Sequence, residues 1–212
     1  QRKRYWLDSS PAQVSGAMGA TGHPLLGAGS SVAGTEMSVF TTVISKNSPD
    51  WVADHVVMEQ TIFPAAGFME LMGAAARAVG GEESWDLSRV VISAPLSLPQ
   101  RGDVRLQVTV DGAEQEGARR VRVYSGQGDE AWTLHTEAKL VLRDGEAEPV
   151  LAAQLPPEGA EPIDVADMYP LLAESGLSYG ERFQGLQQAW RVDDCIWSHV
   201  ALPEQSAERG DL

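Results

Sequence analysis

The segment 64–79 constrains the fold more than any other part of this chain, because it combines a helical pattern with almost no polar surface. Large apolar residues recur along it at the spacing of one helix face: Phe68, Leu71, Met72, Ala75 and Val79. Most of its other positions hold Ala or Gly, and Glu70 and Arg77 are its only charged residues. Pro64 suits a first helical turn, and Gly80-Gly81 would end the helix. A helix that is apolar on every side is a buried helix, so we expect a sheet to wrap over it.

Three segments that follow this helix alternate between apolar and polar residues, which is typical of strands with one buried face. They are residues 104–110, 120–125 and 132–142. In the last of them the alternation predicts a core face of Trp132, Leu134, Thr136, Ala138, Leu140 and Leu142, with His135, Glu137 and Lys139 on the opposite face. Three such strands in succession predict an antiparallel meander. We therefore expect an α+β fold.

The composition limits the partners and the cellular location that we expect for this chain. Its 16 basic and 30 acidic residues give a net charge of −14, which excludes nucleic acid and anionic membranes as partners, because both require a basic surface. The chain has no stretch of apolar residues long enough to span a membrane, and residues 1–6 lack the apolar core of a signal peptide. Cys195 is the single cysteine, so there is no intrachain disulfide. These features predict a cytoplasmic protein.

The acidic charge is concentrated in one part of the chain. Residues 1–142 hold 12 basic and 16 acidic residues, whereas residues 143–212 hold 4 and 14. The change coincides with a proline-containing stretch, 143–162, which we interpret as a linker between two units. The elements expected in the second unit, 163–212, are a helix at 168–174 and strands at 189–192 and 196–202. So few elements cannot bury both their faces, so we expect this unit to be incomplete.

Two patterns that carry chemistry in other proteins are set aside. Residues 176–180, G-L-S-Y-G, match the G-x-S-x-G nucleophile elbow, which needs a strand before the serine and a helix after it. Here a predicted helix precedes the serine and no helical pattern follows. The pairs His55/Glu59 and Cys195/His199 contain metal-ligand types, but neither pair has a third ligand nearby. We expect neither a hydrolase site nor a metal site.

His55 is the candidate catalytic residue. It stands nine residues before Pro64, so the chain between them can turn from a strand into the buried helix. His55 would then lie beside the helix N-terminus at Ala65, Ala66 and Gly67, where free N–H groups and the positive end of the helix dipole favour an oxyanion. A base beside an oxyanion site is what removal of a proton α to a carbonyl requires. The alternative is a structural histidine near a core strand.

Four segments follow one another in an order that points to a known family. They are Q-R-K-R-Y-W-L-D at 1–8, H-P-L-L-G at 23–27, W-V-A-D-H-V-V-M-E-Q-T-I-F-P-A-A-G-F-M-E-L at 51–71 and Y-G-E-R-F-Q-G-L at 179–186. They resemble, in turn, the end of the linker after an acyltransferase domain and three segments of the dehydratase domains of modular type I polyketide synthases. The last two segments resemble the family motifs H-x-x-x-G-x-x-x-x-P and Y-G-P-x-F-Q-G-L. The resemblance covers essentially the whole chain.

The resemblance implies both a fold and a reaction. The fold is a double hot dog, in which each half is an antiparallel sheet around one long helix. This chain would hold a leading linker at 1–20, the first hot dog at 21–142 and the beginning of the second at 163–212. The reaction is removal of water from a β-hydroxyacyl group, with His55 taking the α-proton. An Asp of the second hot dog, expected after Leu212, would protonate the leaving hydroxyl.

The resemblance also implies ligands and partners. The substrate would be carried on the phosphopantetheine of an acyl carrier protein, and the domain itself would bind no cofactor. Partners would be the carrier protein, other domains of the same synthase and, in a homodimer, a second copy. The expected substrate-contacting residues are Glu59, Pro64, Ala65, Ala66, Gly67, Tyr179 and Phe183.

Two residues depart from the family pattern. Glu59 stands at the glycine of the first motif, and Glu181 at the proline of the second. A glycine at such a position permits close approach of a substrate or a backbone angle that only glycine adopts easily. Glu59 would either narrow the substrate path and favour protonated His55, or point into solvent at a loop tip. The departure keeps two alternatives open: a double hot dog that is inactive, isomerises a double bond or closes an oxygen ring, and a scaffold that docks carrier protein and dimerises.

Overall fold

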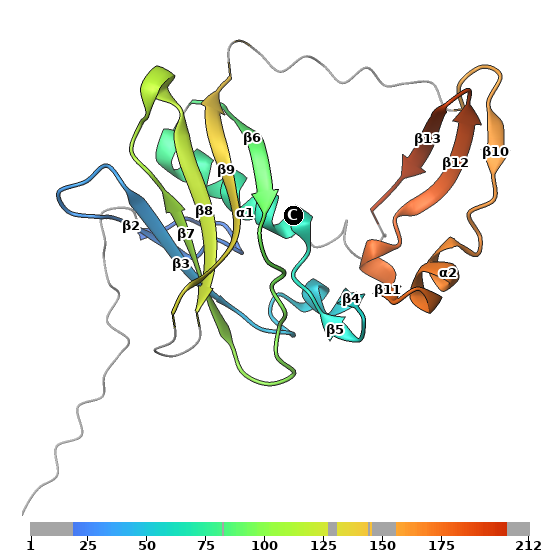
Figure 1. Cartoon of the computed structure of the whole chain (residues 1–212), viewed down its shortest axis with the longest axis horizontal. Coiled ribbons are helices and arrows are strands. Elements are labelled where there is room, and N and C mark those ends of the chain that lie inside the picture. The colour runs from blue at the N-terminus through green and yellow to red at the C-terminus, as the bar shows by residue number, and fades with distance from the viewer. Residues whose placement is uncertain (1–18, 82, 127–130, 144, 146–155, 203–212) are drawn as a thin grey trace, which may run out of the picture.

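The chain forms two units that lie side by side (Figure 1). The computed structural model describes residues 19–81, 83–126, 131–143, 145 and 156–202. The predicted leading linker, 1–20, therefore lies outside the described residues except for its last two, and so does most of the predicted linker 143–162. The first unit is a large sheet around one helix, the second is a small sheet with a short helix, and a third sheet joins them.

The large sheet has seven antiparallel strands in the order β1-β2-β3-β7-β8-β9-β6. Its strands are β1 (Gly19–Ala20), β2 (Ala28–Ser31), β3 (Ser38–Ile44), β6 (Trp85–Ile92), β7 (Val104–Val110), β8 (Arg119–Gly126) and β9 (Thr133–Leu142). A short 3-10 turn, η2 (Gln115–Gly117), lies between β7 and β8. The sheet curves around α1 (Ala65–Gly80), which contacts β6, β7, β8 and β9 (Figure 1). One long helix inside an antiparallel sheet is the arrangement that the apolar helix predicts.

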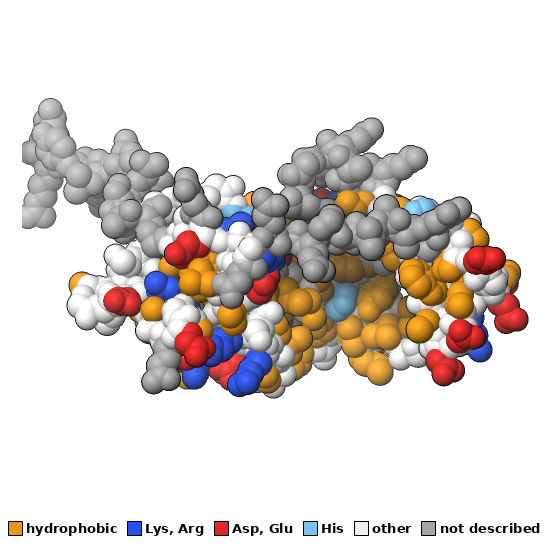
Figure 2. Space-filling model, turned by 90° about the horizontal axis from the view of Figure 1, so that it is seen from above, with side chains coloured by type: hydrophobic (Ala, Val, Ile, Leu, Met, Phe, Trp, Pro, Cys, Tyr) orange, Lys and Arg blue, Asp and Glu red, His pale blue; other side chains and the backbone are white. Residues whose placement is uncertain are grey.

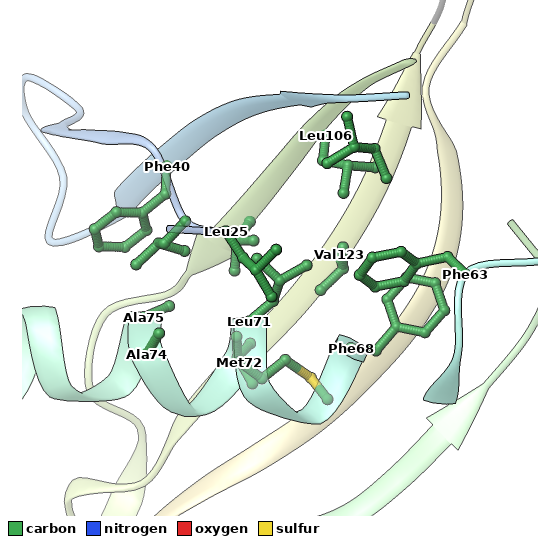
Figure 3. Close-up of a cluster of buried hydrophobic side chains, with 14 of the residues drawn as sticks. Leu25, Phe40, Phe63, Phe68, Leu71, Met72, Ala74, Ala75, Leu106 and Val123 are labelled. Carbon is green, nitrogen blue, oxygen red and sulfur yellow. The ribbon is translucent and has the colours of Figure 1, made fainter. Parts of the chain in front are cut away.

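Side chains of α1 form the centre of the core (Figure 3). Phe68, Leu71 and Met72 are each 2% exposed or less. They pack among apolar side chains of the sheet, including Phe40, Leu106 and Val123. Burying one large apolar side chain contributes about 1.5–3 kcal/mol. The small Ala residues at 74–76 are buried as well, so sheet and helix approach each other closely on more than one face of α1.

The predicted elements of the first unit are confirmed within one residue at each end. β7 spans 104–110 as predicted, and β8 and β9 are neighbours in the expected meander. α1 begins at Ala65 because Pro64 is its N-cap, with an extended backbone, rather than its first helical residue. The helix ends at Gly80, and its C-cap Gly81 has a φ of 62°, a conformation that glycine adopts without strain.

The predicted faces of β9 are wrong at His135 and at the two ends of the segment, where Trp132 and Leu142 are exposed rather than in the core. The pairing of β8 with β9 shifts register, since Val123 lies opposite Thr136 whereas Tyr124 lies opposite Leu134. His135 is the extra residue of this β-bulge. Strict alternation breaks there, and His135 and Thr136 are both buried, at 3% and 0% exposure.

The second unit is a three-stranded antiparallel sheet, β10-β12-β13, with α2 (Met168–Glu174) beside it. Its strands are β10 (Glu161–Ile163), β12 (Leu186–Val192) and β13 (Cys195–Val200). The predicted helix and both predicted strands are confirmed, while β10 begins inside the stretch interpreted as a linker. Every residue of β13 is exposed and α2 has no buried residue. The described part of this unit therefore has little core of its own.

A small third sheet connects the two units. It consists of β11 (Leu177–Tyr179), β4 (His55–Val57) and β5 (Gln60–Thr61), in the order β11-β4-β5. Two single 3-10 turns flank it: η1 (Asp50–Asp54) precedes β4, and η3 (Glu181–Phe183) follows β11. Segments that are more than a hundred residues apart in the sequence thus meet at one place. Within the described residues, no helix is both long and apolar enough to cross a membrane.

Candidate active site

His55 is the first residue of β4 and is partly buried. Its Nδ1 lies 2.8 Å from the carbonyl oxygen of Ile62, and its own carbonyl accepts the Ile62 N–H at 3.1 Å. A carbonyl oxygen can only accept, so we assign the proton of the neutral ring to Nδ1. Nε2 then carries a free lone pair. Such an imidazole is oriented by the backbone and can act as a base through Nε2.

Aromatic rings from both units surround His55. The ring of Tyr179 stacks on it with centroids 5.3 Å apart, and the ring of Phe183 lies 5.2 Å away. Trp51 contacts Phe183 at 6.3 Å and Phe63 at 5.9 Å, so the rings continue into the first unit. Figure 2 shows a hollow between the two units that is lined mainly by hydrophobic side chains and contains a histidine.

Backbone pairing brings the two predicted motifs together. Tyr179 lies directly opposite His55 in the antiparallel pair of β11 with β4. One residue further, the N–H of Gly180 donates to the carbonyl of Asp54 at 2.8 Å. A Cβ at position 180 would come within 2.5 Å of the Asp54 side chain, so only glycine fits this close approach. The glycine of the Y-G-E-R-F segment is therefore explained by packing against the residue before His55.

An ion pair crosses the same junction. The guanidinium of Arg182 in η3 lies 2.8 Å from the carboxylate of Asp50 in η1, through two separate nitrogen–oxygen contacts. The hydrogen bond to Asp50 raises the pKa of Arg182 above its ordinary value, with a further contribution from the charge of Asp54. Two contacts from one guanidinium fix orientation as well as distance. The turns that flank His55 and Tyr179 are therefore tied to each other.

The N-terminus of α1 follows Ile62 closely. The amide of Phe63 donates to Leu96, and those of Gly67 and Phe68 donate to the carbonyl of Pro64 at 3.0 and 3.3 Å. The N–H groups of Ala65 and Ala66 belong to the first turn, whose donors have no acceptor inside a helix. Of the residues 65–67 expected to bind an oxyanion, the first two are thus better suited than Gly67. Gly67 instead leaves room for the ring of Phe63, because a Cβ at position 67 would lie 2.7 Å from that ring.

Glu59 lies exposed at the tip of the hairpin between β4 and β5. Val57 and Gln60 are paired, so Met58 and Glu59 form a two-residue turn, and both have positive φ, at 47° and 64°. This is the turn type in which glycine is preferred, because residues with a Cβ are strained there. This placement agrees with the alternative in which Glu59 points into solvent at a loop tip. Backbone geometry alone accounts for a glycine at this position in the family motif.

The structure shows where the residues of the patterns set aside in the sequence lie. Ser178 lies in β11, after α2 and before a 3-10 turn, so the strand-to-helix elbow of a hydrolase is missing. Cys195 and His199 are exposed on β13. Across the ranges that the structure describes, no three His, Cys, Asp or Glu side chains are grouped so as to hold a metal ion.

The sequence reasoning missed His135. It is buried beside Phe68, with ring centroids 5.9 Å apart, and is hydrogen-bonded to Ser125 and Ala94. Alternation placed it on the outer face, and only the bulge in β9 turns it inward. No signal in a single sequence marks that bulge.

Comparison with known proteins decides the family. A family model described as polyketide synthase dehydratase domain matches residues 23–126, and a second, described as polyketide synthase dehydratase N-terminal domain, matches residues 147–211. The dehydratase domain from the terminal module of the rifamycin polyketide synthase superimposes with a TM-score of 0.81 and 34% identity, over 91% of this chain and 71% of that one. This chain belongs to the polyketide synthase dehydratase domains. Its fold is the hot-dog fold of that family.

Curated relatives of this dehydratase chain are large synthases. It is 42% identical over 208 residues to the mycoketide-CoA synthase of Mycobacterium tuberculosis (strain ATCC 25618 / H37Rv), covering 96% of this chain and 5% of that protein. It is 37% identical over 220 residues to the polyketide synthase GfsE of Streptomyces halstedii, covering 99% of this chain and 6% of that protein. The chain therefore spans only about one twentieth of the length of these two relatives.

Three further similar structures are those of inactive variants or of a domain with a second activity. Two are inactive variants of the CurK dehydratase, one with a histidine replaced by phenylalanine and one with an aspartate replaced by asparagine. They are 27% and 28% identical to this chain, each with a TM-score of 0.77, over 88% of this chain and 66% of theirs. The third is a bifunctional dehydratase-cyclase domain from ambruticin biosynthesis, with 39% identity and a TM-score of 0.76, over 88% of this chain and 64% of that one.

Proposed function

We propose that this chain supplies the histidine base and the oxyanion site of a dehydratase that converts a β-hydroxyacyl thioester into an α,β-unsaturated thioester and water. The observation that carries the proposal is the hydrogen bond from Nδ1 of His55 to the carbonyl of Ile62. It leaves Nε2 as the basic atom. It also fixes the ring to Ile62, which stands three residues before α1 begins. The inactive CurK variant that lacks a histidine supports a histidine-dependent reaction in that relative.

In the proposed reaction, Nε2 of His55 takes the proton from the carbon α to the thioester carbonyl. The electrons of that C–H bond form the new double bond between the α and β carbons as the bond to the β-hydroxyl breaks. Negative charge that develops on the thioester oxygen is stabilised by hydrogen bonds that the N–H groups of Ala65 and Ala66 donate at the helix N-terminus. The hydroxyl leaves as water by taking a proton from an acid.

The acid is expected to be an aspartate of the second hot dog. The inactive CurK variant that lacks an aspartate supports this assignment for the family. The rings of Tyr179 and Phe183 form the apolar wall beside His55 and would exclude water from the reacting carbons. Pro64, the N-cap of α1, holds the chain extended between Ile62 and the oxyanion donors.

The substrate is proposed to arrive on the phosphopantetheine arm of an acyl carrier protein. GfsE is a polyketide synthase and PikAII of Streptomyces venezuelae is a component of one, which supports a carrier-bound substrate and partners within the same cytoplasmic assembly. A thin thioester arm suits a hollow lined by apolar side chains between the two units. No cofactor takes part in the proposed steps.

The test is His55→Ala in the full-length natural polypeptide, assayed with a β-hydroxyacyl pantetheine thioester. Loss of a general base lowers the rate by about 10²–10⁴-fold, and folding is expected to be unchanged. His199→Ala is the matched control, because His199 is exposed on β13. Wild-type turnover in His55→Ala would refute the proposal.

A second function is favoured by one observation, the 39% identity to the ambruticin dehydratase-cyclase. A cyclase of this kind would add a remote hydroxyl of the substrate to the new double bond and close an oxygen ring. A β-hydroxyacyl thioester that carries such a hydroxyl separates the two functions. We expect the open unsaturated product, and accumulation of the ring product only with active enzyme would establish the cyclase.

A further inference from the structure

His135 is a buried histidine that the proposed reaction does not use. Its Nδ1 lies 3.1 Å from the carbonyl oxygen of Ala94, and its Nε2 lies 2.7 Å from the Ser125 hydroxyl. Because the carbonyl can only accept, Nδ1 must donate, and Nε2 then accepts the hydroxyl of Ser125. Burial lowers the pKa of His135 below its ordinary value, although hydrogen bonds with the backbone of Ala94 and Pro95 oppose the change. This direction favours the neutral ring, which suits this pair of hydrogen bonds.

The backbone of His135 holds the same segment as its side chain. Its carbonyl oxygen accepts the N–H groups of Ser93 and Ala94, at 2.8 and 3.4 Å. One histidine thus makes three contacts with two successive residues. Thr136 adds a hydrogen bond from its hydroxyl to the carbonyl of Val91 at 3.0 Å. The chain between β6 and β7 is fixed where it leaves the large sheet.

That chain then pairs with the segment after His55. The Phe63 N–H donates to the carbonyl of Leu96 at 2.8 Å, and the Leu98 N–H donates to the carbonyl of Thr61 at 2.9 Å. Ile62 lies opposite Ser97 in the resulting antiparallel bridge. Leu96 and Leu98 are buried, at 3% and 5% exposure. Residues 96–98 therefore fix the position of residues 61–63.

Residues 61–63 in turn orient His55 and lead into α1. Ile62 exchanges two hydrogen bonds with His55, one with its backbone and one with its ring. Two residues after Ile62 stands Pro64, the N-cap of α1. A shift of residues 61–63 would therefore move the histidine base and the oxyanion donors relative to each other.

Ring packing provides a second connection between the same places. The ring of His135 stacks on Phe68 near the start of α1, and Phe68 packs edge-on against Phe63 with centroids 5.0 Å apart. The Phe63 ring fills the space left by Gly67. His135 thus contacts the first turns of α1 directly, besides its connection through residues 93–98.

We propose that His135 is a positioning residue for the dehydration reaction: by donating to Ala94 it holds residues 93–98 against residues 61–63, and so sets the orientation of His55 relative to the N-terminus of α1. The inference rests on the proposed role of His55. In this role His135 touches no substrate and acts on His55 through the Ile62 carbonyl.

Two substitutions separate the hydrogen bonds of His135. In His135→Asn the side-chain amide nitrogen stands close to the place of Nδ1 and can still donate to Ala94. In His135→Gln the amide reaches the place of Nε2, so the bond with Ser125 is kept while the Ala94 carbonyl loses its donor. Ser125→Ala is the control that removes the other bond and leaves Nδ1 unchanged. All are made in the full-length natural polypeptide, beside His55→Ala.

The expected result is a split between the two variants. A misplaced base or substrate costs up to about 100-fold in rate, so His135→Gln is expected to lower kcat about 10–100-fold with little change in KM. His135→Asn and Ser125→Ala are expected to stay within about threefold of the parent enzyme. Hydrogen exchange at the amides of Phe63 and Leu98 is expected to accelerate only in His135→Gln.

Each other outcome has a defined meaning. Equal losses in His135→Asn and His135→Gln, or parent kcat in His135→Gln, would overturn the inference. If His135→Gln fails to fold, a large fall in kcat in His135→Asn, which keeps the donor to Ala94, would still overturn the inference. Turnover that survives His55→Ala refutes the proposed function itself, whereas turnover that depends on His55 but not on His135 refutes only this inference.

Discussion

The helices of the two units differ in how far they are buried, and the difference shows how the site is built. α1 places Phe68, Leu71 and Met72 at 2% exposure or less, whereas α2 has no buried residue and exposes 61% of Leu171. His55 belongs to the unit with the large core, and Tyr179 and Phe183 belong to the other. The residue assigned to the chemistry is therefore hydrogen-bonded to the unit with the large core, and the apolar wall beside it is held mainly by its junction with that unit.

Among the described residues, a few polar interactions hold that junction together, beside the ring contacts of His55 and Trp51. β11 pairs with β4, Gly180 donates to Asp54, Met58 donates to Gly176, and Arg182 pairs with Asp50. Most of these are backbone hydrogen bonds that need a close approach of two chains. The comparison therefore predicts that core substitutions in the first unit affect stability, while substitutions at the junction affect the site more than the stability.

The largest difference is expected between Leu71→Ala and Leu171→Ala. Leu71 is fully buried in α1, and removing a buried leucine side chain costs about 2–5 kcal/mol of unfolding free energy. Leu171 is exposed in α2, where the same substitution is expected to cost within about 0.5 kcal/mol. Urea unfolding of both variants measures the difference. Equal costs would show that α2 is buried in the natural protein as deeply as α1.

Gly180→Ala tests the junction itself. The new methyl group would collide with the Asp54 side chain, and overpacking of this kind costs about 1–3 kcal/mol. Because Tyr179 and Phe183 flank Gly180, kcat/KM is expected to fall while the core of the first unit stays folded.

Gly73→Ala is the matched control for this substitution. Gly73 lies within α1, and a Cβ there meets only the end of the Arg77 side chain, at 3.5 Å. Replacing a helical glycine by alanine stabilises by up to about 1 kcal/mol, and kcat/KM is expected to stay unchanged. Unchanged kcat/KM in Gly180→Ala would contradict the role of the junction.

Two substitutions of Glu59 separate the effect of its charge from the effect of its backbone angle on stability. Glu59→Gly relieves the positive φ at the hairpin tip and is expected to stabilise the protein by about 0.5–1 kcal/mol, since the unfolded glycine gains entropy that offsets part of the relief. Glu59→Ala removes the carboxylate but keeps the strain, so no gain is expected. Thermal unfolding measures both. The dehydration rate is expected to stay the same in both variants, because Glu59 is exposed.

The smallest effect is expected for the ion pair between Asp50 and Arg182. Exposed pairs contribute about 0.2–1 kcal/mol, and salt weakens them. A double-mutant cycle with alanine at both positions measures the coupling in stability and in kcat/KM. The Glu70–Arg77 pair on α1, at 2.7 Å, is the control, and its cycle is expected to leave kcat/KM unchanged. If the control pair also showed coupling in kcat/KM, the prediction that only junction residues affect the site would be wrong.

Much of the fold could be predicted from local patterns. The apolar helix, the three strands of the meander and the short helix of the second unit are all confirmed, because each rests on periodicity over several residues. The family was also correctly identified from four short motifs. The roles of His55 and of the helix N-terminus remain predictions, and the geometry around Ile62 gives them a physical basis.

What the sequence by itself determined is the apolar surface of α1, which buries Phe68, Leu71 and Met72 because a helix with so little polar surface needs an apolar cover. The hot-dog arrangement was implied by the resemblance of four segments to the dehydratase family. Only the tertiary structure decided which residues meet. The bulge that turns His135 inward and the pairing of His55 with Tyr179 depend on register between strands, and the turn that explains Glu59 depends on the pairing of β4 with β5. Register is set by contacts across the sheet, and no local pattern in one chain contains that information.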